Sequence, residues 1–255
     1  MANAHPVLTP MDPGTRLTVS ENTRDHVDNS QYRSIIGSLM YAATGTRPDL
    51  AFTITYLSQF LKSPTHEHTS AAKRVLKHLG KTADWDLVYR YGTTQLTLEG
   101  YVDSSWGACP DTRRSFNGYI FQVGGCTISW KARKQRSVAT STTEAEYMAM
   151  ALGAKQMMWY KQGLKELGLP LDVPKAIRSD SQGGIDLANN PRISDRSGHI
   201  DIQYHYTRER LLAGDFSLVY VATRDNLADI CTKALTKDTN NRLSTTIMGH
   251  WKEEA

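Results

Sequence analysis

The spacing of apolar residues predicts helices in the first third of the chain. Between residues 30 and 81, apolar side chains recur every three or four positions in three successive runs, as on the buried face of a helix. Pro48 and Pro64 lie near the two boundaries between these runs, where proline favours the start or end of a helix. The pattern therefore predicts a small helical bundle or subdomain.

A different pattern begins at about Tyr89, where apolar and polar residues alternate as they do in half-buried strands. Gly124 and Gly125 separate two alternating segments and indicate a hairpin, so the first strands are expected to form an antiparallel meander. A long helix from Thr142 follows, and beyond it short strands and helices alternate. This order predicts an α/β domain with a mixed five-stranded sheet. The expected later elements are a strand over 176–179, a helix over 183–188, a helix over about 201–212, a strand over 218–221 and a last helix over 227–235.

The same patterns divide the 255 residues into four parts. The first part contains three prolines and little apolar periodicity, and we expect it to need a partner to become ordered. The last part is polar, and we expect it to be frayed or disordered. The predicted parts are an extended arm over 1–29, a helical region over 30–92, an α/β domain over 93–237 and a polar tail over 238–255.

Charge and cysteine content narrow the cellular setting and the partners. The net charge of +4 at pH 7 permits a polyanionic partner such as nucleic acid without requiring one. The three cysteines have no C-x-x-C spacing, which argues against a disulfide framework or a zinc site and favours a reducing, intracellular compartment, the cytoplasm or the nucleus. No run of about 18 apolar residues occurs and the N-terminus lacks a signal-peptide pattern, so we expect no membrane association.

Two glutamates at the start of the long helix have different expected roles. Ser141 and Glu144 form the S-x-x-E pattern of a capping box, in which each side chain bonds an otherwise unpaired backbone amide of the first turn. Glu146 points about 200° around the helix from Glu144, and the sequence after it is apolar on almost every face. We therefore expect Glu146 to enter a buried site, although a lone glutamate in a helix is usually a solvated or capping residue.

Three more acidic residues are expected to meet Glu146 at one edge of the sheet. Asp103 and Asp180 end two predicted strands, and ligands of open α/β sheets gather at the carboxyl ends of strands. Asp229 lies in the first turn of the last predicted helix. Each of these residues alone has an ordinary explanation as a turn former or as a partner of the helix dipole. Together they would repel one another strongly without cations.

This set of ligands predicts a site for hard cations. Oxygen ligands without a nearby histidine or cysteine pattern select Mg²⁺ or Mn²⁺ over zinc. Four carboxylates are the ligand set of a two-metal phosphodiesterase site, in which the ions lie about 3.5–4 Å apart and one of them generates hydroxide. We therefore expect two Mg²⁺ or Mn²⁺ ions per site and hydrolysis of a nucleic-acid backbone.

Several short motifs carry a resemblance to a known family. Downstream of residue 100 they are 101–107 (YVDSSWG), 114–119 (RSFNGY), 129–135 (SWKARKQ), 141–147 (STTEAEY), 179–181 (SDS), 198–206 (GHIDIQYHY) and 227–233 (LADICTK). As a set they resemble the ribonuclease H domain of copia-type LTR retrotransposon polyproteins. The helical motifs 32–41 (YRSIIGSLMY), 46–49 (TRPD) and 72–76 (AKRVL) are similar to the thumb and connection region that precedes that domain in a reverse transcriptase. The resemblance covers about residues 6–237 in the same order.

The resemblance implies a ribonuclease H-like mixed sheet flanked by helices and preceded by a small helical subdomain. It implies endonucleolytic cleavage of the RNA strand of an RNA–DNA hybrid, with the polymerase portion of a reverse transcriptase as a further partner. The family's four metal-binding catalytic carboxylates match Asp103, Glu146, Asp180 and Asp229. Such an enzyme must contact the 2′-hydroxyl and follow the backbone with basic and amide groups. The residues expected to make these contacts, each equally compatible with a solvated surface position, are Arg114, Ser115, Lys131, Arg133, Lys134, Gln135 and Ser181.

Two features depart from the family pattern or limit it. Many ribonucleases H carry a histidine in the loop before the last acidic helix, but residues 221–226 contain none. His199 or His205 could serve, although a locally bonded histidine is the more ordinary interpretation of each. No Y-x-D-D motif occurs, so we expect no DNA polymerisation by this chain alone. Two alternatives stay open: a transposon-derived module that binds nucleic acid or protein without turnover, and an unrelated nuclease or integrase-like member of the same fold.

Overall fold

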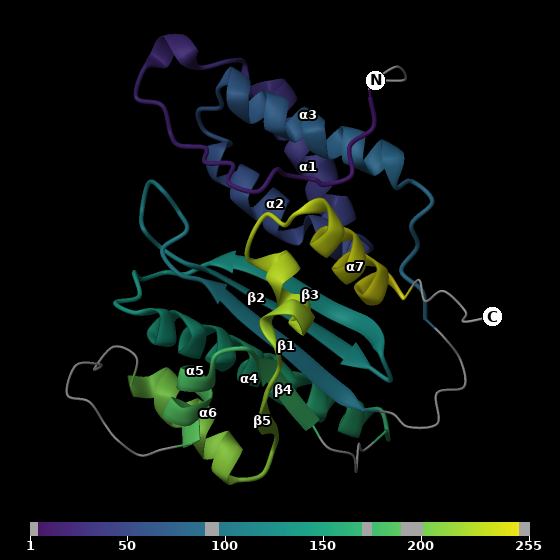
Figure 1. The fold of residues 1–255 in the computed structure, drawn as a ribbon, viewed down its shortest axis with the longest axis vertical. Helices are drawn as coiled ribbons and strands as arrows, with labels where there is room; N and C mark the ends of the chain where they lie inside the picture. The colour runs from purple at the N-terminus through teal and green to yellow at the C-terminus, as the bar shows by residue number, and fades with distance from the viewer. Residues whose placement is uncertain (1–4, 90–96, 170–174, 190–200, 250–255) are drawn as a thin grey trace.

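The computed structural model describes residues 5–89, 97–169, 175–189 and 201–249, and a mixed five-stranded sheet lies at its centre (Figure 1). The strands lie in the order β3-β2-β1-β4-β5, with antiparallel pairing among the first three and β4 parallel to both β1 and β5. The expected fold class and the three-stranded meander are confirmed. The strands are β1 (Leu98–Ser105), β2 (Phe116–Val123), β3 (Cys126–Lys134), β4 (Lys175–Ser179) and β5 (Ser217–Tyr220).

Three helices cover one face of the sheet (Figure 1): α4 (Thr142–Glu166), α5 (Gln182–Asn189) and α6 (Asp201–Leu212). Between α4 and the strands lies an apolar core that includes Met150, Met157 and Ile177. The helix approaches β1 closely at Gly153, where an added Cβ would lie 2.5 Å from Cγ1 of Val102. Glycine is the residue that permits this approach.

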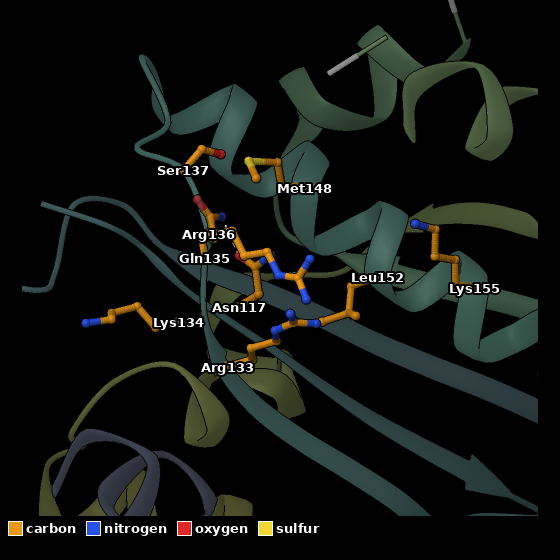
Figure 2. A pocket seen from close by; sticks show the side chains of 9 residues that line it. All are labelled: Asn117, Arg133, Lys134, Gln135, Arg136, Ser137, Met148, Leu152 and Lys155. Atoms are coloured by element: carbon orange, nitrogen blue, oxygen red, sulfur yellow. Dashed lines mark hydrogen bonds between the residues drawn. The ribbon is translucent and has the colours of Figure 1, made fainter. Parts of the chain in front are cut away.

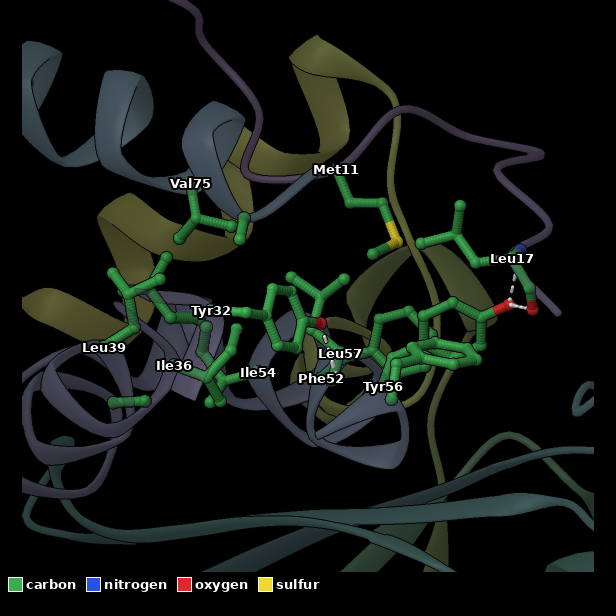
Figure 3. Packing of buried hydrophobic residues seen from close by; sticks show 14 of the residues in the cluster. Met11, Leu17, Tyr32, Ile36, Leu39, Phe52, Ile54, Tyr56, Leu57 and Val75 are labelled. Atoms are coloured by element: carbon green, nitrogen blue, oxygen red, sulfur yellow. Dashed lines mark hydrogen bonds between the residues drawn. The ribbon is translucent and has the colours of Figure 1, made fainter. Parts of the chain in front are cut away.

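The predicted helical subdomain is present on the other face (Figure 1). Its core is a cluster of buried apolar side chains that includes Tyr32, Leu57 and Val75 (Figure 3). Pro48 opens a short 3₁₀ helix between the first two helices, and Pro64 precedes the N-terminus of the third, so both prolines mark boundaries as expected. The elements are α1 (Asn29–Gly45), α2 (Ala51–Leu57) and α3 (His66–Lys81), with 3₁₀ helices η1 (Thr23–Asp25), η2 (Pro48–Leu50) and η3 (Ser58–Phe60).

A buried group of charged side chains holds this subdomain together. The guanidinium of Arg47 donates hydrogen bonds of 2.8 and 2.9 Å to the carboxylate of Asp49 and a further one to the Thr82 carbonyl. Nε2 of His78 lies 3.1 Å from the same carboxylate. Asp49 is therefore paired with two residues although it is buried. The group also connects η2 with the end of α3.

The subdomain packs directly on the sheet. Phe52 of α2 contacts Phe116 of β2 edge-on, with ring centroids 5.3 Å apart. Nε1 of Trp130 in β3 donates a 2.6 Å hydrogen bond to the carbonyl of Ala43 at the end of α1. The boundary placed between residues 92 and 93 stays a prediction, since residues 90–96 lie outside the described part of the chain.

The expectation that the N-terminal arm needs a partner to become ordered is wrong for its described residues. Met11 and Leu17 are buried in the core of the helical subdomain of the same chain (Figure 3). The hydroxyl of Tyr56 donates to the Leu17 carbonyl and accepts from the Leu17 amide, both at 3.0 Å. Asp12 forms an ion pair with Arg74 of α3. Two anchoring apolar residues thus hold a segment that has no helical or strand periodicity.

The end of the chain also differs from its prediction. The expected frayed tail is wrong over Lys237–Met248, which form a helix (α7) that buries Leu243, Ile247 and Met248 against η5 and the face of the sheet that carries the helical subdomain. The predicted last helix over 227–235 is instead a short 3₁₀ helix, η5 (Leu227–Cys231). Within the described residues, none of the helices is both long and apolar enough to cross a membrane.

Candidate metal centre

Three of the four predicted acidic ligands converge at one edge of the sheet. Carboxylate oxygens of Asp103, Glu146 and Asp180 all lie within 4.8 Å of one another. They come from three separate elements: Asp103 from β1, Glu146 from the second turn of α4, and Asp180 from the residue directly after β4. β1 continues to Ser105, so Asp103 lies inside the strand and does not end it. The parallel pairing of β1 with β4 brings the two aspartates together.

The fourth predicted ligand, Asp229, lies beside this group but outside it. It belongs to η5, and its Oδ1 forms a 2.8 Å ion pair with Nζ of Lys233, four residues further on. The charge of Asp103 contributes to the raised pKa of Asp229, so the two carboxylates lie near one another. The structure therefore brings four acids to one region, with three of them close enough to share a cation.

The two glutamates of α4 divide their roles as the sequence predicts. Oγ of Ser141 accepts a 3.1 Å hydrogen bond from the amide of Glu144 and so caps the helix. The carboxylate of Glu144 accepts from the amide and hydroxyl of Thr140, at 2.7 and 2.5 Å, one residue before the expected partner. Glu146 points to the aspartates instead. Its Oε2 is buried and has no hydrogen-bond partner among the described residues, which fits a position that a metal ion would satisfy.

Burial and mutual repulsion make these acids hard to ionise without a cation. Burial, followed by the charges of Asp103 and Asp180, raises the pKa of Glu146 to about 9. Burial raises the pKa of Asp103, and burial together with the charge of Asp103 raises that of Asp229 to about 7. Hard divalent cations prefer such all-oxygen ligand sets, and a bound cation would reverse this repulsion. The residues present therefore fit Mg²⁺ or Mn²⁺.

Three residues of the last 3₁₀ segment and its flanks support the centre, and the contacts of two of them, Thr232 and Asn226, have no local sequence signal. The Thr232 hydroxyl donates to the carboxylate of Asp103. Nδ2 of the buried Asn226 donates to the Val102 carbonyl at 3.0 Å and to Oδ1 of Asp180 at 3.2 Å. These contacts join positions up to 129 residues apart, and no local pattern records them. The third residue is Lys233. Its i to i+4 spacing from Asp229 is a local sequence pattern that indicates an ion pair.

Among the described residues, Lys233 is the cationic side chain that acts on these acids. Burial lowers the pKa of Lys233, but the charges of Asp103, Asp229 and Asp180 outweigh this effect and raise it. The same ammonium group opposes the upward shift of the pKa values of Asp103 and Asp229. One cation faces several carboxylates, so the centre remains short of positive charge.

The predicted nucleic-acid contacts occupy two kinds of position. Ser115 and Gln135 are buried: Oγ of Ser115 accepts from the Gly107 amide, and Nε2 of Gln135 donates to neighbouring strands. Oγ of Ser181 accepts from the Gly184 amide at the start of α5. Lys134 donates to Gln59 of the helical subdomain. The other three predicted contacts, which have no hydrogen bond or ion pair of their side chains among the described residues, are Arg114, Lys131 and Arg133.

Of the two candidate histidines, only His205 lies in the described part of the chain, and it is not among the clustered ligands. His205 is exposed on α6, and His199 lies outside the described residues. The short 3₁₀ helix η4 (Thr223–Asp225), which precedes η5, carries Arg224 and Asp225, and these two residues form an ion pair with each other. No described histidine therefore takes the place expected from the family pattern.

Comparison with known proteins identifies homologues of this chain. No family model matches the chain. It is 40% identical over 237 residues to the retrovirus-related Pol polyprotein from transposon RE1 of Arabidopsis thaliana, a match that covers 93% of this chain and 16% of that protein. It is 38% identical over 246 residues to the corresponding polyprotein from transposon TNT 1-94 of Nicotiana tabacum. The homologues of this chain are copia-type retrotransposon Pol polyproteins, which match 93% of its length. This Pol segment spans 16% to 18% of the length of these relatives.

Two weaker or partial similarities accompany this assignment. The Pol segment is 42% identical over 132 residues to secreted RxLR effector protein 161 of Plasmopara viticola, covering 51% of this chain and 92% of that protein. A solved structure of LC11-RNase H1 in complex with an RNA/DNA hybrid aligns with a TM-score of 0.41 at 14% identity, over 53% of this chain and 93% of that one. The fold class rests on the strand order and pairing of the sheet itself.

Proposed function

We propose that this Pol segment hydrolyses the RNA strand of RNA–DNA hybrids with two bound Mg²⁺ or Mn²⁺ ions. The observation that carries the proposal is the convergence of Asp103, Glu146 and Asp180 within 4.8 Å at one edge of the sheet. Homology to retrotransposon Pol polyproteins supports the choice of substrate, because copying RNA into DNA produces such hybrids.

The proposed roles follow from how each acid is held. Asp103 lies on β1 and Asp180 directly follows the neighbouring parallel strand β4. Asn226 and Thr232 fix their side chains, so the two can bind one cation with little rearrangement. Glu146 completes this group from the capped end of α4, and Asp229 is the proposed fourth ligand. When bound, the ions would supply a hydroxide nucleophile and stabilise the leaving oxygen.

The proposed recognition residues act in different ways. Arg114, Lys131 and Arg133 are proposed to contact backbone phosphates directly, since their charged groups have no hydrogen-bond or ion-pair partner in the described structure. Ser115 and Gln135 are buried and could act only through the backbone that they hold in place. The remaining part of a reverse transcriptase, its polymerase portion, is the proposed protein partner, with the helical subdomain as the connection to it.

A cleavage assay with matched variants tests the function. The full chain is incubated with a labelled RNA–DNA hybrid in Mg²⁺ and in Mn²⁺, beside single-stranded RNA and duplex RNA. We expect cleavage of the hybrid alone. Asp180→Asn should abolish it while sparing hybrid binding, because the substitution removes charge at nearly constant shape. Asp186→Asn, an exposed aspartate on α5, serves as the control and should cleave like the parent.

A second candidate function is a module that binds nucleic acid or a protein without turnover. The similarity to secreted RxLR effector protein 161 favours this second candidate, because the match covers 92% of that protein. Tight hybrid binding with no cleavage in either metal would support this alternative and refute hydrolysis. Equal cleavage by Asp180→Asn and its parent would instead show that the site is misassigned.

A further inference from the structure

A basic pocket lies between the end of β3 and the first half of α4 (Figure 2). Its volume is about 270 Å³. Arg133 and Gln135 line it from the strand side, Arg136 from the residue that follows, and Leu152 and Lys155 from the helix. The pocket thus has a partly apolar wall and four cationic lining residues, of which Lys134 is the fourth.

The positive charge of this pocket is not balanced. None of its lining residues is acidic, and the side chains of Arg133, Arg136 and Lys155 make no ion pair or hydrogen bond to any residue that the structure describes. Figure 2 shows the guanidinium groups of Arg133 and Arg136 extending into the space between strand and helix, whereas Lys134 points the other way. Lys134 is bonded to Gln59 on the opposite face of β3. Three like charges around one cavity repel one another unless an anion lies between them.

The wall of this pocket is also a wall of the metal centre. Nε2 of Gln135 donates to Oγ of Ser104 at 3.3 Å and to the Ala145 carbonyl at 3.2 Å. Ser104 directly follows Asp103, and Ala145 directly precedes Glu146. The pocket is therefore coupled by rigid backbone to two of the proposed metal ligands, and the distance between the two sites is fixed by the fold.

We propose that this basic pocket binds one backbone phosphate of the hybrid while another phosphate of the same hybrid lies at the carboxylates. The inference rests on the proposed function for its choice of ligand. Guanidinium groups match a phosphate with paired N–H donors, and Lys155 adds a point charge from the facing helix. A duplex lying across the sheet edge extends well beyond one phosphate, so two anchors on one rigid wall fix its register at the metal centre.

A second phosphate anchor predicts a specific kinetic effect. Removing it should weaken hybrid binding and raise KM, while kcat at saturating hybrid changes less than twofold, because the residues do not touch the reacting phosphate. Each phosphate contact also contributes about 0.7 to 0.9 to the slope of log K against log salt. Loss of the anchor should therefore lower that slope by about one.

The experiment measures hybrid binding by fluorescence anisotropy over a range of salt concentrations. Asp180→Asn is the background, so that the hybrid stays intact, and Arg136→Gln and Lys155→Gln are added to it singly. We expect each addition to raise Kd about five- to tenfold at low salt and to lower the salt slope. Lys165→Gln, an exposed lysine near the end of α4, is the matched control and should leave both unchanged.

A titration with inorganic phosphate separates a backbone phosphate from a free anion. Amide resonances of Arg136 and Lys155 are followed in the full chain, with chloride at equal ionic strength as the reference. Variants that lose hybrid affinity and salt slope support the proposal. Variants that lose only the response to inorganic phosphate identify a free-anion site and overturn it, as do variants that match the control in both assays. Cleavage by the parent chain is measured separately. A parent chain that binds the hybrid without cleaving it would refute the proposed function, and the binding assay would still test the pocket.

Discussion

Two buried groups of charged side chains differ in whether their charges are balanced. In the helical subdomain, Asp49 lies between Arg47 and His78. Burial alone would raise the pKa of Asp49, but hydrogen bonds from these two residues lower it below its usual value. At the sheet edge, burial and neighbouring acids raise the pKa of Glu146 to about 9, and Lys233 opposes this only in part.

The difference separates a structural cluster from a site that binds a cation. A buried carboxylate with its own cation needs nothing from solution, and removing either partner leaves the other charge unpaired. A buried carboxylate among other carboxylates is unfavourable for the fold until a cation arrives. We therefore expect substitutions of acids in the two regions to change stability in opposite directions.

The largest effect is expected for Asp49→Ala. Because the substitution leaves Arg47 buried without its partner, we expect a loss of about 3–5 kcal/mol in the free energy of unfolding. Urea denaturation followed by circular dichroism measures it. Asp84→Ala, at an exposed position after α3, is the control and should stay within about 0.5 kcal/mol of the parent. A stable Asp49→Ala protein would remove the contrast between the two regions.

The opposite sign is expected for Glu146→Gln in the absence of metal. Replacing this acid with a neutral isostere should stabilise the chain by about 1–4 kcal/mol at about pH 8. Because the folded pKa of about 9 lies above the ordinary value of 4.5, the contribution of Glu146 to stability is fully present below pH 4.5 and is lost as pH rises toward 9. Urea denaturation in EDTA across this range should show a flatter pH profile for the variant.

Magnesium supplies the control for this pH dependence. Adding Mg²⁺ to the parent should restore the stability that is lost at high pH, since the cation binds the ionised form. The Glu146→Gln protein should gain less. If Mg²⁺ stabilised both equally, or neither, Glu146 would not be a ligand.

A smaller effect is expected for Lys233→Met, which removes the internal cation from the unbalanced region. The side chain is 41% exposed, so solvent screening should limit the loss of stability in EDTA to about 1 kcal/mol. The affinity for Mg²⁺, measured by calorimetry, should rise about fivefold, because the ion no longer competes with an ammonium group for Asp229. Lys237→Met on α7 is the matched control. Unchanged affinity would show that Lys233 and the metal do not share this partner.

Local patterns in the sequence predicted most of the fold, and they failed where burial depends on distant contacts. The sheet, α4 and the helical subdomain follow from periodicity, because each element buries one regular face. The arm was mispredicted since two isolated residues, Met11 and Leu17, hold it. α7 was missed because its composition is polar, although Leu243 and Ile247 repeat at helical spacing.

The candidate centre shows the same division. The positions of Glu146 and Asp180 on their elements were readable, since a capped helix start and a strand end can be located locally. Asp103 was expected to end its strand but lies two residues before the end of β1. The residues that support these acids could not be predicted from local patterns. Asn226, for example, donates a hydrogen bond to a carbonyl 124 residues away. The unbalanced charge of the basic pocket was equally invisible, because Arg136 and Lys155 line one pocket only once β3 and α4 are packed. Long-range pairing, rather than residue type, decided these features.

The smallest effect, and the finest test of the contrast, comes from Glu144→Gln. This acid is two residues from Glu146 but bonds Thr140 at the helix start. We expect a loss of about 0.5–1 kcal/mol, typical of a weakened helix cap, with no dependence on Mg²⁺. Urea denaturation with EDTA and with Mg²⁺, beside Glu146→Gln, measures both. Because the two acids lie two residues apart on one helix and have the same chemistry, a Mg²⁺ response that is reduced in Glu146→Gln and unchanged in Glu144→Gln can arise only from where each carboxylate points.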